Sequence, residues 1–108
     1  MLQLFEFSKS KNIKPFIIGN GSNLLVTDKG IDNVVIKIGS KLSRIELIDE
    51  TTIHCEAGAS LKSLCMSAYE NSLSGLEFAY GIPGTLGGAV YMNAGAYDGE
   101  MANVVTAV

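Results

Sequence analysis

The sequence predicts an α+β fold, in which short strands and helices from separate stretches of the chain pack together as layers. Three observations support this prediction. The runs "PFIIG" and "VVIKI" have the β-branched composition of short strands. The segments "RIELID" and "TTIHCEA" flank Asp49-Glu50 as the two arms of a hairpin would. The segment "ASLKSLCMSAYEN" places its apolar residues at helical spacing.

The N-terminal elements are predicted in order as a helix and three strands. Residues 2–12, "LQLFEFSKSKN", fit strand alternation nearly as well as a helix face, but their polar Lys/Ser tail and Pro15 beyond it favour a helix. "PFIIG" predicts a short, fully buried strand, with proline tolerated at its first residue. "LLV" and "VVIKI" predict two more strands, separated by a turn that contains Asp28 and Gly30.

The second half begins with a hairpin and a helix. The hairpin is predicted around Asp49-Glu50. The helix follows Gly58, and Ser60 is a plausible N-cap because its side-chain oxygen can accept a hydrogen bond from the first turn. His54 is predicted to be an ordinary strand residue, since no companion ligands form a metal site around it.

The stretch Gly19-Asn20-Gly21-Ser22-Asn23 admits two interpretations. Asn-Gly between apolar runs is typical of a type I′ hairpin turn, whose two central residues have φ above zero. The same residues can also form a cradle, in which successive backbone N–H groups and small polar side chains surround a phosphate.

Composition excludes some classes of function. The 108 residues carry a net charge of −3 and a pI near 5.0, which argues against a general nucleic-acid or membrane-surface binder. No apolar run is long enough to span a bilayer, and the N-terminus lacks signal-peptide order, so we expect a cytoplasmic setting. Cys55 and Cys65 lack metal-site spacing and are expected to be reduced, partly buried thiols.

Charge is distributed unevenly along the chain. All eight Lys and Arg residues lie between Lys9 and Lys62, whereas residues 63–108 carry four carboxylates and no cation. An anion bound by the C-terminal half must therefore be held by backbone N–H groups and hydroxyls, or by groups from elsewhere.

The segment from Gly75 to Gly99 combines glycine with apolar residues. Its 25 residues include seven glycines, whereas flexible glycine-rich linkers are polar. One interpretation is a glycine-rich helix with tight turns, in which Gly87-Gly88-Ala89 permits close backbone approach. The other adds a planar ligand laid against that bare backbone.

Two motifs together carry a resemblance to a known family. "GNGSNLLV" and, about fifty residues later, "GLEFAYGIPGTLGGAVYMNAGAYDGEM" make the chain similar to the UDP-N-acetylenolpyruvoylglucosamine reductase family of flavoenzymes, also called UDP-N-acetylmuramate dehydrogenases, in its shorter type. The resemblance implies an FAD-binding fold of the vanillyl-alcohol oxidase and p-cresol methylhydroxylase type, with two small α+β subdomains. Residues 1 to about 58 would form the first subdomain and residues from about 59 to 108 the start of the second, with the substrate-binding domain absent.

The resemblance assigns cofactor-binding residues in three segments. The loop around the FAD pyrophosphate would comprise Gly19, Asn20, Gly21, Ser22, Asn23 and Leu24. The second flavin-contacting segment would comprise Ile82, Pro83, Gly84, Thr85, Gly87 and Gly88. The segment beside the isoalloxazine would comprise Asn93, Ala94, Gly95 and Ala96, with Tyr97 on the substrate side. Asp98 departs from the family's usual glycine, and we expect it to face solvent.

The resemblance also implies the chemistry and what the chain lacks for it. The family uses noncovalently bound FAD and transfers hydride from NADPH to a UDP-sugar enolpyruvyl ether in peptidoglycan precursor synthesis. Its catalytic serine, arginine and glutamate motifs do not occur in these 108 residues. We therefore expect an N-terminal fragment that needs the remainder of the same polypeptide, without catalytic residues or metal of its own. Two alternatives are another FAD oxidoreductase of the same fold and a truncated module without catalysis.

Overall fold

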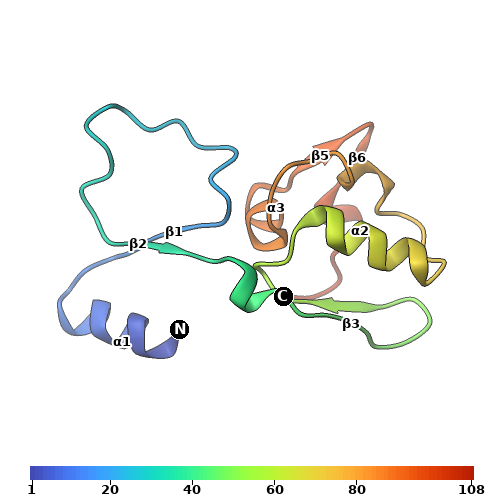
Figure 1. Cartoon of the computed structure of the whole chain (residues 1–108), viewed down its shortest axis with the longest axis horizontal. Helices are drawn as coiled ribbons and strands as arrows, with labels where there is room; N and C mark the ends of the chain where they lie inside the picture. Colours follow the sequence, from blue (N-terminus) through green and yellow to red (C-terminus); the bar gives the residue numbers. More distant parts are fainter.

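A computed structural model describes all residues from Met1 to Val108, with principal extents of 46 × 30 × 20 Å. Figure 1 shows two parts: residues 1–38 form an open N-terminal part, and residues 39–108 form a denser C-terminal part. No helix is both long enough and apolar enough to cross a membrane.

The N-terminal part contains α1 (Leu2–Ser10), β1 (Phe16–Ile18) and β2 (Val35–Lys37). The predicted first helix is therefore confirmed. The two strands pair in parallel, with Ile17 opposite Ile36, so the chain between them must cross over and cannot close as a tight hairpin. In Figure 1 this connection, residues 19–34, is a wide loop without regular structure.

Two predictions for this part are wrong, and one of the two interpretations of Asn20-Gly21 is excluded. The excluded interpretation is the Asn-Gly hairpin: Gly21 has φ +70°, but Asn20 does not have the positive φ that a type I′ turn also requires. "LLV" is not a strand, because residues 24–26 have no partner strand, and their β-propensity counts for little without one. The first strand is not fully buried, since a two-stranded sheet leaves Phe16 37% and Ile17 49% exposed.

The C-terminal part follows the predicted order more closely. A 3₁₀ turn, η1 (Ser40–Leu42), leads into the antiparallel pair β3 (Ile45–Leu47) and β4 (Ile53–Cys55). The helix α2 (Leu61–Glu70) starts at the predicted cap, where the Ser63 N–H donates to Ser60 Oγ at 3.0 Å. His54 is an exposed strand residue, and both cysteines are free thiols, as predicted.

The glycine-rich segment forms short elements around one core. These are η2 (Glu77–Ala79), α3 (Leu86–Met92), the hairpin of β5 (Gly95–Ala96) and β6 (Gly99–Glu100), and η3 (Met101–Asn103). Together with α2, these elements enclose a buried cluster made of Leu61, Cys65, Phe78, Ala79, Ala89 and Met101. The predicted glycine-rich helix is confirmed: Gly87 lies where a Cβ would come 2.8 Å from the Cβ of Ala57.

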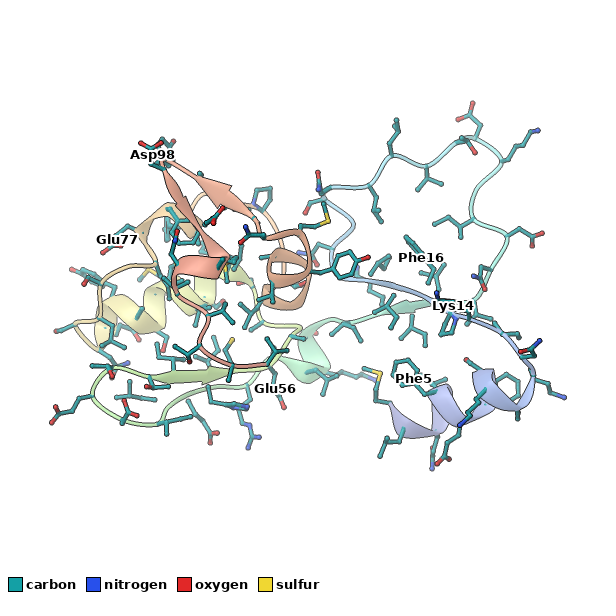
Figure 2. The ribbon with its side chains drawn as sticks, turned by 180° about the vertical axis from the view of Figure 1, so that it is seen from behind. Phe5, Lys14, Phe16, Glu56, Glu77 and Asp98 are labelled. Carbon is teal, nitrogen blue, oxygen red and sulfur yellow. The ribbon has the colours of Figure 1, made fainter.

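Few side chains are buried overall. Only 13 of the 108 residues are buried, although 47% of the residues are apolar. The exposed apolar side chains include Leu2, Phe7 and Leu25 of the N-terminal part, at 79%, 57% and 100%. Figure 2 shows α1 and β1 of this part, with Phe5 and Phe16 labelled, standing apart from the C-terminal elements.

Candidate functional site

The candidate site lies where the loop after β1 meets the segment before α3. These two segments are 61 positions apart, yet the hydroxyl of Ser22 donates a 2.7 Å hydrogen bond to the carbonyl oxygen of Pro83. The two glycine-rich motifs that the sequence singles out are therefore in direct contact.

The contact is close because Gly19 has no side chain. A Cβ built on Gly19 would clash with the hydroxyl oxygen of Thr85. A Cβ on Gly84 would in turn come 3.6 Å from Ser22 Oγ. Any larger residue at Gly19 would push the two segments apart.

Thr85 carries an unusual hydroxyl at the centre of this contact. The residue is 4% exposed, and its Oγ1 makes no hydrogen bond within the protein. Leaving a buried hydroxyl unpaired costs about 1 to 3 kcal/mol, so such groups are rare and call for an explanation. A bound ligand with a hydrogen-bonding group beside Thr85 would supply the missing partner.

The backbone around Thr85 also has free donors. The N–H groups of residues 19–23 lie outside the strands and donate to no protein atom, and the same holds for those of Gly84, Thr85 and Gly88. Pro83 has no N–H, so the free donors of the second segment begin at Gly84. An anion bound between the segments could therefore be held by main-chain N–H groups, and residues 63–108 contribute no cation to bind it.

The segment before α3 is itself firmly held by its neighbours. The Leu86 and Gly87 N–H groups donate to the carbonyls of Ala59 and Ala57 at 2.8 Å, and the Leu61 N–H donates to the carbonyl of Gly84 at 3.1 Å. Residues 57–59 are thus a support that the sequence reasoning missed. The signal was Ala-Gly-Ala itself, three small residues that let backbones approach closely.

Side chains at the loop are largely free to meet a ligand. Asn20 and Asn23 are exposed, and Ser22 is the only residue of 19–23 whose side chain hydrogen-bonds within the protein. Leu24 is 45% exposed, whereas Ile82 packs against the core. The two asparagines therefore remain available as donors to an anion.

The third predicted segment differs in that its polar side chain is already engaged. Asn93 hydrogen-bonds to Glu100 and to the main chain of Ala102, and Ala94 packs against the core. Gly95 and Ala96 form β5, and the following Tyr97 is 94% exposed.

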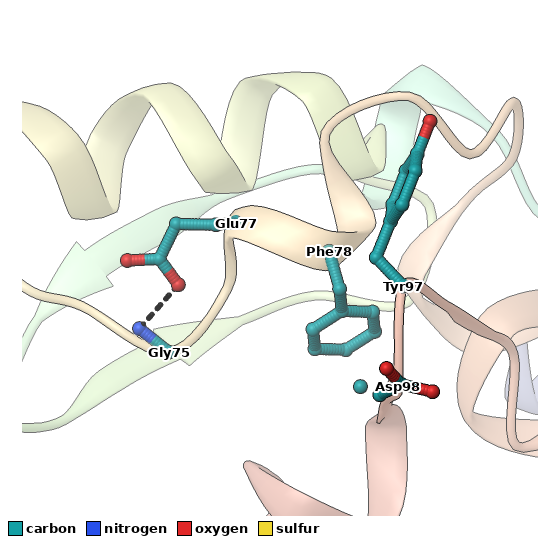
Figure 3. Close-up of a pocket in the computed structure, with 6 residues that line it drawn as sticks. Gly75, Glu77, Phe78, Tyr97 and Asp98 are labelled. Atoms are coloured by element: carbon teal, nitrogen blue, oxygen red, sulfur yellow. Dashed lines mark hydrogen bonds between the residues drawn. The ribbon is translucent and has the colours of Figure 1, made fainter.

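A hollow of about 400 Å³ adjoins Tyr97 on the side of Phe78 and Glu77 (Figure 3). The Gly75 N–H donates to Glu77 Oε2 at 2.7 Å on its far wall. Asp98 is exposed at the tip of the hairpin, as predicted, and Figure 2 shows it at the edge of the molecule.

Lys62 of α2 is the last cation along the chain. Its Nζ lies 5.9 Å from the ring centre of Tyr80, within range of a cation–π interaction. The salt bridges of the chain lie at the β3–β4 hairpin, where Arg44 Nε is 3.7 Å from Glu46 Oε2 and 4.0 Å from Glu56 Oε1. No three His, Cys, Asp or Glu side chains gather as a metal site would need.

The profile of the FAD binding domain matches residues 2–108. The chain belongs to the FAD-binding domain family. The residues at this contact suit FAD, the group named in the family's description. They offer free main-chain donors and an unpaired buried hydroxyl, which are groups that can bind an anionic cofactor. The predicted mixed α+β FAD-binding fold is likewise confirmed.

Relatives of this FAD-binding domain are named reductases. The chain is 52% identical to UDP-N-acetylenolpyruvoylglucosamine reductase of Syntrophomonas wolfei over 106 residues, which are 98% of this chain and 35% of that protein. It is 50% identical to the enzyme of that name from Clostridium perfringens over 105 residues, 97% of this chain and 34% of that protein. The chain thus spans about a third of the length of these relatives.

A solved structure supports the same relationship. The crystal structure of UDP-N-acetylenolpyruvylglucosamine reductase from Thermus caldophilus superposes with a TM-score of 0.71 and 40% identity. The superposition covers 91% of this chain and 35% of that one. The recognised resemblance to this family is therefore confirmed.

Proposed function

We propose that this chain is the FAD-binding part of a UDP-N-acetylenolpyruvoylglucosamine reductase. The observation that carries the proposal is the contact of the two glycine-rich segments through Ser22, Pro83 and Thr85, in a chain that shares about half its residues with enzymes of that name. The parent enzyme would reduce UDP-N-acetylglucosamine enolpyruvate to UDP-N-acetylmuramate with NADPH.

The bound FAD would supply the hydride relay between NADPH and the enolpyruvyl ether. Residues of this chain would bind and orient it. The free N–H groups of residues 19–23 and the hydroxyl of Thr85 would hold its diphosphate, and the β5–β6 region would lie beside its ring system. The site residues assigned by resemblance remain proposals in this scheme, as does the subdomain boundary near residue 58.

The catalytic proton donor and the cations for the substrate would come from outside these 108 residues. Residues 63–108 contain no Lys, Arg or His, and their tyrosine phenols are poor acids near neutral pH. A reaction on a substrate with a carboxylate and a diphosphate needs a positioned acid and positive charge. We therefore expect the chain alone to be inactive and the parent enzyme to act in the cytoplasm on a small UDP-sugar.

The exposed apolar side chains of residues 1–38 support a further part of the proposal. Leu2, Phe7 and Leu25 are at least half exposed, and burial of such side chains is favourable. We propose that the remainder of the same polypeptide covers them.

Two measurements test the proposal. The polypeptide that contains this sequence is purified, denatured and centrifuged, and noncovalent FAD is expected in the supernatant. Anaerobic NADPH oxidation is then followed with UDP-N-acetylglucosamine enolpyruvate added and, as the control, with the sugar nucleotide lacking the enolpyruvyl group. Absence of flavin, or oxidation that ignores the enolpyruvyl group, would contradict the proposal.

A further inference from the structure

Asn93 joins three elements of the C-terminal part. It follows the last residue of α3, its Nδ2 donates to Glu100 Oε2 of β6 at 3.0 Å, and its Oδ1 accepts from the Ala102 N–H of η3 at 2.9 Å. Both halves of the side-chain amide are therefore used within the protein.

Glu100 continues the same network into η3. Its N–H donates to Asn103 Oδ1 at 3.0 Å, and its own carboxylate accepts from the Asn103 main chain, a reciprocal capping box. No cation pairs with Glu100, so its carboxylate is held by hydrogen bonds from Asn93 and Asn103. Hydrogen bonds to an ionised acceptor are stronger than those between neutral groups.

The hairpin enclosed by this network is strained. Tyr97 and Asp98 at its turn have φ of +51° and +64°, in the left-handed region that a two-residue hairpin turn requires and that aspartate tolerates but tyrosine rarely adopts. Gly95 is pressed against the opposite strand, where an added Cβ would lie 2.6 Å from the Gly99 carbonyl oxygen. A two-residue pairing alone is a weak restraint for such a turn, so its position depends on anchors outside the hairpin.

We propose that Asn93 and Glu100 form a latch that positions the β5–β6 hairpin, and with it Tyr97, beside the bound flavin. The inference rests on the proposed function for the presence of the flavin there. Asn93 is in this view a positioning residue, whose side chain acts through Glu100 and Ala102. This role replaces the cofactor contact that the resemblance assigns to its side chain. The latch fixes both ends of the hairpin, because Asn93 precedes β5 by two residues and Glu100 ends β6.

The charges around the latch define how it can be tested. Asp98 and Glu100 line a common hollow of about 390 Å³, and Glu77 lines the adjoining one. The N93D substitution adds a further carboxylate that faces Glu100, and residues 63–108 contain no cation to offset it. Adding the E100Q substitution removes the repulsion and restores the bond with its direction reversed, since the Gln amide can donate to the Asp carboxylate.

The experiment compares N93D, E100Q and the double variant in the polypeptide that contains this sequence. We expect N93D to weaken FAD binding about tenfold, because the charge-assisted hydrogen bond between residues 93 and 100 is lost. The double variant should recover most of that loss. The flavin absorbance spectrum should shift in N93D and return in the double variant.

A second readout does not depend on the cofactor. Hydrogen exchange of the Ala102 amide in FAD-free protein should speed up in N93D and slow again in the double variant. A loss of FAD binding that persists unchanged in the double variant would mean that Asn93 contacts the flavin directly, and would overturn the latch. An exchange rate at Ala102 that is the same in all variants would also overturn the latch. If the wild-type protein binds no FAD but its Ala102 amide is still protected from exchange, only the proposed function is contradicted.

Discussion

The hydroxyl of Ser22 donates to the carbonyl oxygen of Pro83 at 2.7 Å, across 61 positions of sequence. It is the one side-chain hydrogen bond that joins the loop after β1 to the segment before α3. Because the bond is exposed, it contributes little to global stability, but it joins the two segments directly.

Ser22→Ala should therefore weaken FAD binding with almost no change in thermal unfolding of the FAD-free protein. Loss of one such bond is worth about 1 kcal/mol, or about fivefold in the dissociation constant. Flavin fluorescence titration measures it. Ser10→Ala is the matched control, since Ser10 makes an equally exposed 2.7 Å bond to Phe7 within α1, far from the site.

Asn23→Ala tests the free donors of the loop apart from the Ser22 bond. Asn23 is exposed and makes no hydrogen bond in the protein, so its removal should leave the FAD-free protein unchanged. If its amide donates to a phosphate oxygen, FAD binding should weaken by about 1.5 to 3 kcal/mol. An unchanged dissociation constant would remove Asn23 from the proposed cofactor site.

Gly19→Ala should separate the two segments. The new methyl group would clash with Thr85 Oγ1, and overpacking of this kind costs about 1 to 3 kcal/mol. FAD affinity and thermal stability should both fall, as measured by titration and calorimetry. Gly39→Ala is the control, because a Cβ there meets nothing within 4 Å; an equal loss in both variants would mean that close packing at Gly19 is not the cause.

Local chemistry made some elements predictable from sequence. The α2 cap at Ser60 and the β3–β4 hairpin rest on interactions between neighbours in the chain, which composition and spacing reveal. The hairpin interpretation of Asn20-Gly21 is excluded because β1 pairs with a strand seventeen or more positions away, and no local rule encodes that choice. Likewise "LLV" has the composition of a strand but no partner.

The candidate site was predictable in its residues more than in its geometry. The glycines at 19, 87 and 95 stood out in the sequence, yet which atoms they meet depends on tertiary contacts. The unpaired state of Thr85 and the engagement of Asn93 could not be predicted either, since each depends on residues from other elements. Only the spacing Glu100-x-x-Asn103, which allows a capping box, was a local sign of the network around Asn93.

Cys55 provides a prediction about pH. Burial, and secondarily the charge of Glu56, raises the pKa of the Cys55 thiol from 9.0 to about 11. Because the unfolded thiol ionises first, the folded state loses stability as pH rises from about 9 toward about 11, and keeps this contribution below that range. In a Cys65→Ser variant, Cys55 is the one thiol of these 108 residues, and its thiolate absorbance should titrate near 11; titration near 9 would contradict the prediction.

Substitutions of Thr85 should change the free energy of unfolding and the affinity for FAD in opposite directions. Thr85→Val replaces an unpaired buried hydroxyl with a methyl group of the same shape, so the FAD-free protein should gain about 1 to 3 kcal/mol of unfolding free energy. FAD should nevertheless bind more weakly, because the hydroxyl that the cofactor would satisfy is gone. Thr85→Ser, which keeps the hydroxyl and loses a methyl group, should do the reverse: lower stability with FAD affinity largely retained. Chemical denaturation and flavin titration on the same samples measure both quantities. Parallel changes of stability and affinity in the two variants would mean that Thr85 serves packing alone, and that the free oxygen is not part of the cofactor site.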